Sequence, residues 1–340
     1  MCIRDSLAIA LACGAKPVVT GTFREDSFPL MLDMLVAAAG GEERLRKRPI
    51  AVFDCCPTSP LHWSGLTAGA LLDCARAGVP AEIVAMPMTG ATAPATLAAA
   101  VAQHCAEVLS GVVIHQLAAP GGPVVYGGSP AAFDMRHGTT PMGAVETMML
   151  DGANAEIGRR LGLPVHAYIA LSDAKLVDYQ GGFETGMGAA IAALSSVDLA
   201  AGPGMLDFES CQSPEKLLLD NEICGMARRL RAGIALREEP LARTVVAEGT
   251  LRGDFLSLSH TARWFRAETF FPGRLVDRLP WERWKKEGGQ DAAARAASEA
   301  ERILAEAPPP AIDPAVVRHL REAAAADLRA AGMDRIPDWY

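Results

Sequence analysis

The sequence lacks the motifs and the long apolar runs on which several large protein classes depend. It contains no GxGxxG stretch and no GxxxxGKS or GxxxxGKT stretch, which argues against dinucleotide-binding and P-loop proteins. It has no basic run and carries a net charge of −8, so we expect no nucleic-acid partner. No segment reaches the roughly 20 apolar residues of a membrane span, and the first residues do not form a signal peptide. We therefore expect a cytoplasmic protein that does not contact a membrane.

Cysteine and histidine are present, but not in the spacings that bind metals or form disulfide frameworks. None of the eight cysteines lies in a CxxC pair, and none of the seven histidines lies in an HxxxH or HxH pair. We interpret the cysteines as small core residues of a reducing compartment and expect no metal site. His115 and His166 lie in apolar segments, so we interpret them as hydrogen-bonded core residues. A GxSxG elbow is absent as well, which argues against a serine hydrolase.

Short apolar runs alternate along the chain with longer segments of helical period. The runs predict strands at 17–20, 50–53, 82–85, 112–116, 124–126, 165–169 and 197–200, and the longer segments predict helices at 28–39, 65–77, 93–109, 143–161 and 179–194. Strands that alternate with helices build parallel sheets. A doubly wound sheet normally has a glycine-rich nucleotide loop near its first strand. Because that loop is absent, and because about seven strands followed by long polar loops are predicted, we predict an α/β fold of the (β/α)8 TIM-barrel type, with the barrel incomplete.

Glycines mark where the predicted helices end. Gly40, Gly78 and Gly162 each follow a predicted helix shortly before the next strand, as a C′ glycine does. After residue 216 the pattern changes to helices at 217–230, 291–306 and 315–331, with a less regular aromatic stretch at 249–271 and a proline break at 308–310. We expect one domain over residues 1–340, with a barrel core at about 16–235 and a helical appendix at about 236–340.

In a barrel, functional side chains follow the carboxyl ends of the strands, and three such loops here are rich in polar residues. The loop at 127–140 contains Asp134 and Arg136, which either belong to a site or form an ion pair that orders the loop. A second loop contains Asp173, which either belongs to a site or caps the next helix. The loop at 202–209 carries two carboxylates, which either bind a ligand or are solvated.

Five segments, in one order along the chain, carry a resemblance to a known family. They are MTGATAPATL at 88–97, PVVYGG at 123–128, FDMRHG at 133–138, SDAK at 172–175 and LLLDNEI at 217–223. Together they resemble the trimethylamine methyltransferase (MttB-like) family. The resemblance implies an eight-stranded barrel that transfers a methyl group from a methylamine to the cobalt of a corrinoid protein. Family members have a longer N-terminal part, and residues 1–7 do not read like family sequence, so we expect a fragment boundary there.

The absence of one residue type narrows the expected substrate. One branch of the family uses pyrrolysine to activate trimethylamine, and this chain contains only the twenty standard residues. It therefore resembles the branch without pyrrolysine. A quaternary ammonium loses a methyl group as a neutral amine, so its reaction needs positioning more than acid catalysis. We expect a quaternary (or tertiary) methylamine such as glycine betaine, carnitine, proline betaine or choline. The corrinoid is expected on a partner protein, with no cofactor bound tightly by this chain.

We choose the candidate substrate-binding residues from their positions in these loops and not from any family assignment. Aromatic faces and carboxylates suit a trimethylammonium group, and a basic group suits a substrate carboxylate. The candidates are the aromatic residues Tyr126, Phe133, Tyr168 and Phe208, the acids Asp134, Asp173, Asp207 and Glu209, the basic residues Arg136, His137 and Lys175, and also Met205. The sequence assigns no catalytic residue.

Two other hypotheses remain open at this stage. A barrel lyase or aldolase would use Lys175 as a Schiff-base amine, and this requires a buried lysine near the barrel axis. A betaine-binding barrel without turnover is the non-enzymatic alternative. In each case we expect a homo-oligomer that binds a small molecule.

Overall fold

The computed structural model describes residues 3–238, 240–307 and 312–330. The chain forms two compact units. The first consists of Met1–Tyr168, Ser195–Ala201 and Glu306–Tyr340, and the second of Ile169–Leu194 and Gly202–Ala305. The described residues combine helices with a parallel sheet, and this confirms the predicted α/β class.

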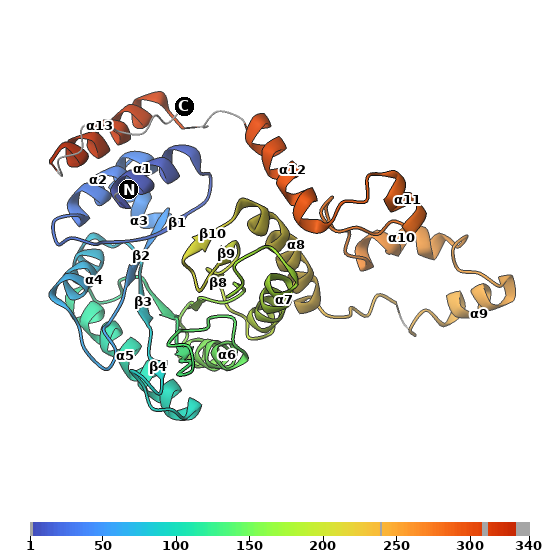
Figure 1. The fold of residues 1–340 in the computed structure, drawn as a ribbon, viewed down its shortest axis with the longest axis horizontal. Coiled ribbons are helices and arrows are strands. Elements are labelled where there is room, and N and C mark those ends of the chain that lie inside the picture. Colours follow the sequence, from blue (N-terminus) through green and yellow to red (C-terminus); the bar gives the residue numbers. More distant parts are fainter. Residues whose placement is uncertain (1–2, 239, 308–311, 331–340) are drawn as a thin grey trace. The chain divides into compact units, whose positions relative to one another are not determined.

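The first unit is built on parallel strands that follow one another in chain order (Figure 1). Its main sheet contains β1 (Val18–Gly21), β2 (Ala51–Cys55), β3 (Ala81–Ala85) and β5 (Val124–Gly128). A parallel bridge between Tyr126 and Val165 connects β5 to β7 (His166–Ala167), which pairs in turn with β8 (Leu199–Ala200). The short strands β4 (Met88–Thr89) and β6 (Ala131–Ala132) also pair in parallel.

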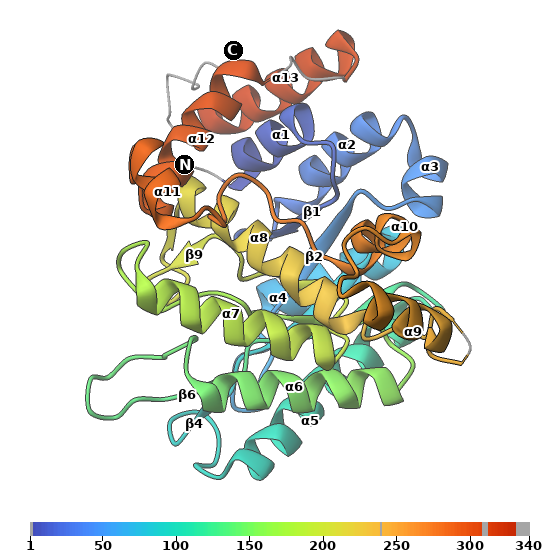
Figure 2. The same ribbon diagram turned by 90° about the vertical axis from the view of Figure 1, so that its right-hand side faces the viewer.

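Helices connect these strands and cover one face of the sheet. They are α1 (Ile3–Cys13), α2 (Phe28–Ala39), α3 (Glu42–Lys47), α4 (Gly65–Ala77), α5 (Leu97–Ala118), α6 (Val145–Arg160) and α13 (Pro314–Ala330). The predicted bounds of α2 and α4 are confirmed. Figure 2 shows α13 beside α1 and α2, which it contacts although they lie about 300 residues apart in the sequence.

The helix-covered face of the sheet is apolar. Phe53 of β2 packs against Phe28 of α2, with ring centroids 5.2 Å apart, and Tyr126 of β5 lies against Gly158 of α6. Successive residues of a strand point to opposite faces. Asp54 follows Phe53 and therefore points away from the helices.

We call the opposite face of the sheet the inner face. The register of the strands determines which side chains lie on it. Asp54 pairs with Glu82, so these two side chains share a face. Tyr126 pairs with Val165 on the helix side, which directs the next residue, His166, and then Tyr168, to the inner face. Four polar side chains thus lie on the face that the helices leave uncovered.

One predicted strand is wrong, because residues 112–116 lie inside α5. The β-branched, apolar run at these positions is the pattern that favours a strand. Close packing at Gly111 explains why this segment is helical. A Cβ at this position would lie 2.8 Å from the Trp63 ring and 2.9 Å from Ile83 of β3. The bare glycine lets α5 approach the sheet closely, and this packing overrides the local preference.

Among the described helices, α5 is the one whose length and composition would allow it to cross a membrane. It carries the buried polar residues His104, Glu107 and His115 and packs against β3 and β5. These are the contacts of a helix that covers a sheet, so α5 does not argue for a membrane span.

The glycine signals at the helix ends are confirmed. Gly40, Gly78 and Gly162 all adopt left-handed backbone conformations, with φ of 78°, 71° and 74°. In α4 and α6, the amide after the glycine donates to the carbonyl five residues earlier, which is the Schellman pattern. Both exits then reach a proline, Pro80 or Pro164, whose carbonyl accepts a hydrogen bond from the neighbouring strand. The same local chemistry therefore directs the chain into two successive strands.

The second unit is mainly helical. It contains α7 (Tyr179–Leu194), β9 (Met205–Leu206), β10 (Cys211–Gln212), α8 (Pro214–Arg231), α9 (Arg243–Arg252), α10 (Ser259–Glu268), α11 (Trp281–Lys286) and α12 (Ala292–Glu306). α7 and α8 pack side by side (Figure 2). The predicted bounds of α7 are confirmed, and the stretch predicted as less regular holds α10. The predicted proline break at 308–310 lies outside the described residues.

Candidate functional site

The inner face of the first unit gathers four polar side chains from distant parts of the sequence. The Tyr168 hydroxyl donates a hydrogen bond to Asp54 Oδ2 at 3.2 Å. His166 Nδ1 lies 3.2 Å from Glu82 Oε1, and the rings of His166 and Tyr168 meet edge to face, with centroids 4.9 Å apart. Asp54 and Glu82 are register partners on adjacent strands. We call these four residues the inner-face cluster.

Burial sets the protonation of the two carboxyl groups. Glu82 is fully buried, and burial, together with the adjacent Asp54 carboxyl, raises the pKa of Glu82 from 4.5 to about 10. Burial also raises the pKa of Asp54, but the Glu82 and Tyr168 side chains partly offset this rise. A buried carboxyl group with a high pKa keeps its proton at neutral pH. Glu82 is therefore a neutral acid, and Asp54 is the member of the pair that ionises first.

The histidine of the cluster is neutral as well. His166 is 2% exposed, and burial lowers its pKa to about 4. The 3.2 Å contact with Glu82 is therefore not an ion pair at neutral pH. Among the described residues, neither ring nitrogen of His166 and neither carboxyl oxygen of Glu82 has a hydrogen-bond partner. The interpretation of His166 as a hydrogen-bonded core residue is wrong.

These buried polar atoms point to a ligand-binding face. A buried polar group without a partner costs about 1–3 kcal/mol, and native proteins normally satisfy such groups with protein atoms or ordered water. Glu82 and His166 carry four such atoms, of which Glu82 Oε1 and His166 Nδ1 lie 3.2 Å apart, and Asp54 Oδ1 is a fifth. The inner-face cluster is therefore the strongest candidate for a functional site in the first unit.

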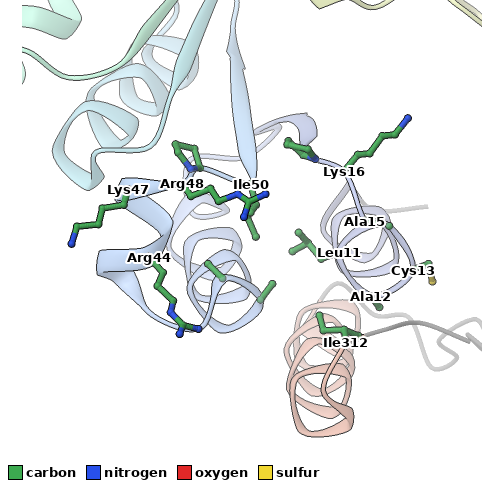
Figure 3. Close-up of a pocket in the computed structure, with 15 residues that line it drawn as sticks. Leu11, Ala12, Cys13, Ala15, Lys16, Arg44, Lys47, Arg48, Ile50 and Ile312 are labelled. Atoms are coloured by element: carbon green, nitrogen blue, oxygen red, sulfur yellow. The ribbon is translucent and has the colours of Figure 1, made fainter.

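A cavity of about 690 Å³ also opens in the first unit (Figure 3). It is lined by residues that precede β1 and β2, among them Lys16, Arg48 and Ile50, and by Ile312. Ligands of parallel α/β sheets bind at the carboxyl ends of the strands, and this cavity lies at the amino ends. Figure 3 also shows the Lys16 side chain extending away from the other lining residues. We therefore do not place a substrate in this cavity.

The charged side chains of the loop after β6 pair with one another. Arg136 donates to both carboxylate oxygens of Asp134, at 3.1 and 2.8 Å, and His137 Nδ1 lies 3.0 Å from Asp134 Oδ2. The Arg136 guanidinium holds the pKa of Asp134 well below its usual range. The side chains of Arg136 and His137 are 83% and 69% exposed, and Phe133 in the same loop is half-buried. The structure thus brings three predicted residues together as an ion-paired surface loop.

Tyr126 and Tyr168 lie on opposite faces of the sheet. Tyr126 is fully buried on the helix-covered face, and its hydroxyl lies 3.5 Å from His104 Nδ1 of α5. Burial raises the pKa of Tyr126 above its usual value. Of the predicted residues in the first unit, Tyr168 is the one that joins the inner-face cluster.

The remaining predicted residues lie on two loops of the second unit that are joined through their backbones. The Ser172 amide donates to the Met205 carbonyl at 3.2 Å, and the Asp207 amide donates to the Ala174 carbonyl at 3.0 Å. Asp207, Phe208 and Glu209 have φ of 50°, 55° and 80°. Three consecutive residues with side chains in the left-handed region store backbone strain. Such strain persists only where the surrounding contacts enforce it.

Lys175 is the centre of these contacts. Its Nζ lies 3.2 Å from Asp207 Oδ1 and 3.8 Å from the centroid of the Phe208 ring, and it donates to the Asp173 carbonyl at 2.7 Å. The Lys175 side chain is 59% exposed. A Schiff-base lysine must be buried to act as a neutral nucleophile, so Lys175 does not meet the requirement of the lyase hypothesis.

Glu184 of α7 holds the first of the two loops in place. Its carboxylate accepts hydrogen bonds from the Ser172 hydroxyl at 2.5 Å and from the Asp173 amide at 2.9 Å. The suggestion that Asp173 caps the next helix is wrong, because Asp178 takes that role by accepting from the Gly181 amide at 3.1 Å. Asp173 is instead buried within the loop.

A buried ion pair on α8 anchors the second loop. Lys216 Nζ lies 2.5 Å from Asp220 Oδ2 and donates to Thr185 Oγ1 at 2.7 Å, and Asp220 also accepts from the Gly204 amide at 2.7 Å. Both charged side chains are at most 3% exposed. This pair therefore connects α7, α8 and the loop that carries Asp207.

Sequence reasoning missed Asp54, Glu82 and His166 as site residues. A signal was available for each of them: a single polar residue within an otherwise apolar strand, at a position that buries its side chain. Lys216 and Asp220 had a comparable signal, since they are opposite charges at i and i+4 on either side of three leucines.

The parallel sheet, the helices on one of its faces and the polar cluster on the other define an α/β protein with a buried polar site. The trimethylamine methyltransferase (MTTB) family matches residues 6–332. The chain belongs to this family, and the resemblance in its loop segments is thereby confirmed.

Individual relatives agree with this assignment. The chain is 34% identical over 290 residues to a trimethylamine methyltransferase of Desulfitobacterium hafniense. The matched region covers 85% of this chain and 58% of that protein. It is 36% identical over 275 residues to a trimethylamine methyltransferase of Methanosarcina barkeri, with coverage of 80% and 55%. It is also similar to a glycine betaine methyltransferase of Desulfitobacterium hafniense, at 34% identity over 278 residues with coverage of 82% and 58%. The chain thus spans little more than half the length of these relatives.

Proposed function

We propose that the protein transfers a methyl group from a quaternary methylamine to the corrinoid of a partner protein. The observation that carries this proposal is the inner-face cluster, in which the half-buried Asp54 and the buried Glu82 lie beside the aromatic rings of Tyr168 and His166. Carboxylates and aromatic rings are the groups that attract a methylated ammonium, which has no N–H to donate. Family membership and the similarity to a glycine betaine methyltransferase point to the same chemistry.

The proposal includes a (β/α)8 barrel as the scaffold. Six strands, from β1 to β8 by way of the Tyr126–Val165 bridge, follow one another in parallel and in chain order. Helices connect the strands on one face, and side chains of alternate residues point to the other. A barrel places its functional residues inside and at the carboxyl ends of its strands, and this agrees with the position of the inner-face cluster.

The residues of the inner-face cluster have different roles in substrate binding. Asp54 supplies the negative charge that balances the ammonium group, and Tyr168 orients Asp54 through its hydroxyl. The ring of Tyr168 offers an aromatic surface to the methyl groups. The corrinoid of the partner protein supplies the methyl acceptor, and the donor leaves as a neutral amine. The protein therefore contributes chiefly orientation and charge balance.

A spectroscopic assay tests the proposal. The full chain is mixed with a corrinoid protein reduced to Co(I), and methylation is followed by absorbance with glycine betaine, carnitine, proline betaine, choline and trimethylamine as donors. We expect transfer from at least one quaternary amine, and a loss of about 100-fold or more on Asp54→Asn because the charge that balances the ammonium is gone. Transfer from trimethylamine alone would refute the proposed substrate class. Binding of a betaine without transfer would favour the non-enzymatic hypothesis.

A cytoplasmic, homo-oligomeric enzyme remains part of the proposal. Sedimentation of the purified chain, alone and with the corrinoid protein, tests the oligomeric state and the partner together.

A further inference from the structure

The outer face of α7 lacks charged residues. α7 contains one charged residue, Glu184, and this residue is buried on the opposite face together with Thr185 and Gly188. A surface helix normally carries charged and polar side chains on its outer face, and a helix that is apolar all round is normally buried. The composition of α7 is therefore typical of a helix that another surface covers. Its outer face, which we call the α7 stripe, follows helical spacing and consists of Tyr179, Gly182, Phe183, Gly186, Met187, Ala190 and Leu194.

The α7 stripe exposes large side chains to solvent. Between 43% and 86% of each is exposed, in the order Met187, Phe183, Leu194 and Tyr179. The two aromatic rings contact each other edge to face, with centroids 5.6 Å apart. Because a buried aromatic side chain covers about 150–250 Å², these four side chains together expose roughly 500 Å². Two copies of the stripe would bury roughly 1,000 Å² from these side chains alone, which is the smallest area expected of a specific interface.

The glycines on the two faces of α7 differ in their surroundings. On the buried face, a Cβ at Gly188 would lie 2.8 Å from the Ala170 amide nitrogen, so close packing explains this glycine. On the outer face, a Cβ at Gly182 or Gly186 would meet no described atom within 4 Å. Glycine weakens a helix relative to alanine, and no packing within the described chain compensates for it at these two positions. Close approach of a second helix to the α7 stripe would explain both.

We propose that two copies of this chain form a dimer through the α7 stripe. The inference rests on the homo-oligomer of the proposed function and identifies the surface that builds it. A two-fold axis brings the same surface of both copies together, so this surface has to be complementary to itself. The α7 stripe meets that condition, because it carries aromatic rings next to open space over Gly182 and Gly186, which the rings of a second copy fill. It also carries no charge that would repel its copy.

A second copy fits this surface better than the corrinoid protein does. In the proposed function, the corrinoid protein has to bind and dissociate in every reaction cycle. The interfaces of permanent complexes are more hydrophobic than those of transient ones, and charged residues steer transient partners together. The α7 stripe is apolar and uncharged, which is the composition of a permanent interface.

Sedimentation equilibrium of the full chain over a concentration series tests the proposal. We expect the wild type to dimerise. Phe183→Glu should raise the dissociation constant about 100-fold or more, because two carboxylates would be buried without partners between the helices. The Phe183 ring is half exposed, and its aromatic neighbour Tyr179 lies on the same helix. The variant should therefore keep the circular dichroism spectrum of the wild type.

Two further variants separate a specific effect from a loss of folding. Gly186→Leu fills the open space and favours the helix, so it should weaken the dimer while the melting temperature of dilute, monomeric protein does not fall. Leu251→Glu is the matched control, because Leu251 is 90% exposed on α9 and its replacement puts the same charge on another apolar part of the surface. This control should dimerise like the wild type.

The outcomes separate this inference from the proposed function. A wild-type chain that stays monomeric throughout the series would overturn the inference, and so would a dimer that Phe183→Glu leaves unchanged or that Leu251→Glu disrupts. If Phe183→Glu stays dimeric but no longer binds the corrinoid protein, the α7 stripe is the docking surface of that partner, and the inference is overturned as well. A dimer formed through the α7 stripe that transfers no methyl group to a Co(I) corrinoid protein would overturn the proposed function and leave the interface intact.

Discussion

The buried proton on Glu82 should have a measurable cost in stability. In the unfolded chain this carboxyl has a pKa near 4.5, and in the folded protein burial raises the pKa to about 10. A group that binds its proton more tightly in the folded state makes folding less favourable as pH rises from the unfolded to the folded pKa. Each pH unit in that window costs about 1.4 kcal/mol. Between pH 7.0 and 8.5, Glu82 should therefore remove about 2 kcal/mol from the free energy of unfolding.

Glu82→Gln isolates this effect. The amide does not titrate, so the variant should lose about 2 kcal/mol less than the wild type over the same interval, and it should be more stable at pH 8.5. Urea unfolding followed by circular dichroism at pH 7.0 and 8.5 measures the difference. This interval lies above the pKa of histidine in the unfolded chain, so protonation of His166 and His104 does not contribute.

Val84→Ala is the matched control. Val84 lies on the same strand as Glu82, two residues further along, and is 1% exposed. Its truncation should lower stability by about 1–3 kcal/mol at both pH values without changing the dependence on pH. If the wild type and Glu82→Gln show parallel pH profiles, Glu82 is not protonated in the folded protein, and the reasoning from its burial fails.

Three further predictions concern other parts of the molecule. Lys216→Met should lower the free energy of unfolding by about 3–5 kcal/mol, because it leaves the buried Asp220 carboxylate without its cation; a loss below 1 kcal/mol in urea unfolding would contradict this account. Gly202→Ala should destabilise the chain by about 1–3 kcal/mol or more, because the new Cβ would lie 2.3 Å from the Ile169 carbonyl oxygen; an unchanged melting temperature would show that the backbone yields freely. His166→Gln should reduce the loss of stability as pH falls from 6.5 to 4, because in this range the histidine is protonated in the unfolded chain but not in the folded protein. The melting temperature measured across this pH range tests the prediction, and an unchanged dependence on pH would refute it.

Local signals accounted for the helices whose bounds were predicted correctly. α2 and α4 end at Gly40 and Gly78 in the left-handed conformation, and the Ser64 side chain caps the start of α4 by accepting from the Thr67 amide. These interactions involve residues at most a few positions apart. A sequence therefore contains all the information that they need.

The strands that carry the inner-face cluster were predicted, but the cluster was not. Asp54, Glu82 and His166 are separated by 28 and 84 residues, and they meet because the register of the strands aligns them. Register depends on pairing between distant segments and on packing of the helix-covered face. The protonation of Glu82 follows from that arrangement, since burial is a property of the folded chain.

The sequence by itself determined the α/β class, most of the helices and strands, and the family. Periodicity, helix caps and loop segments each depend on residues that are close together in the chain. Only the tertiary structure decided that residues 112–116 are helical, because Gly111 packs closely against Ile83 and Trp63, which lie far from it in the sequence. It also decided that Tyr126 faces α5 and α6 whereas Tyr168 joins Asp54. The physical reason is the same in each case: which face a side chain occupies, and what it meets there, depends on contacts between segments far apart in the sequence.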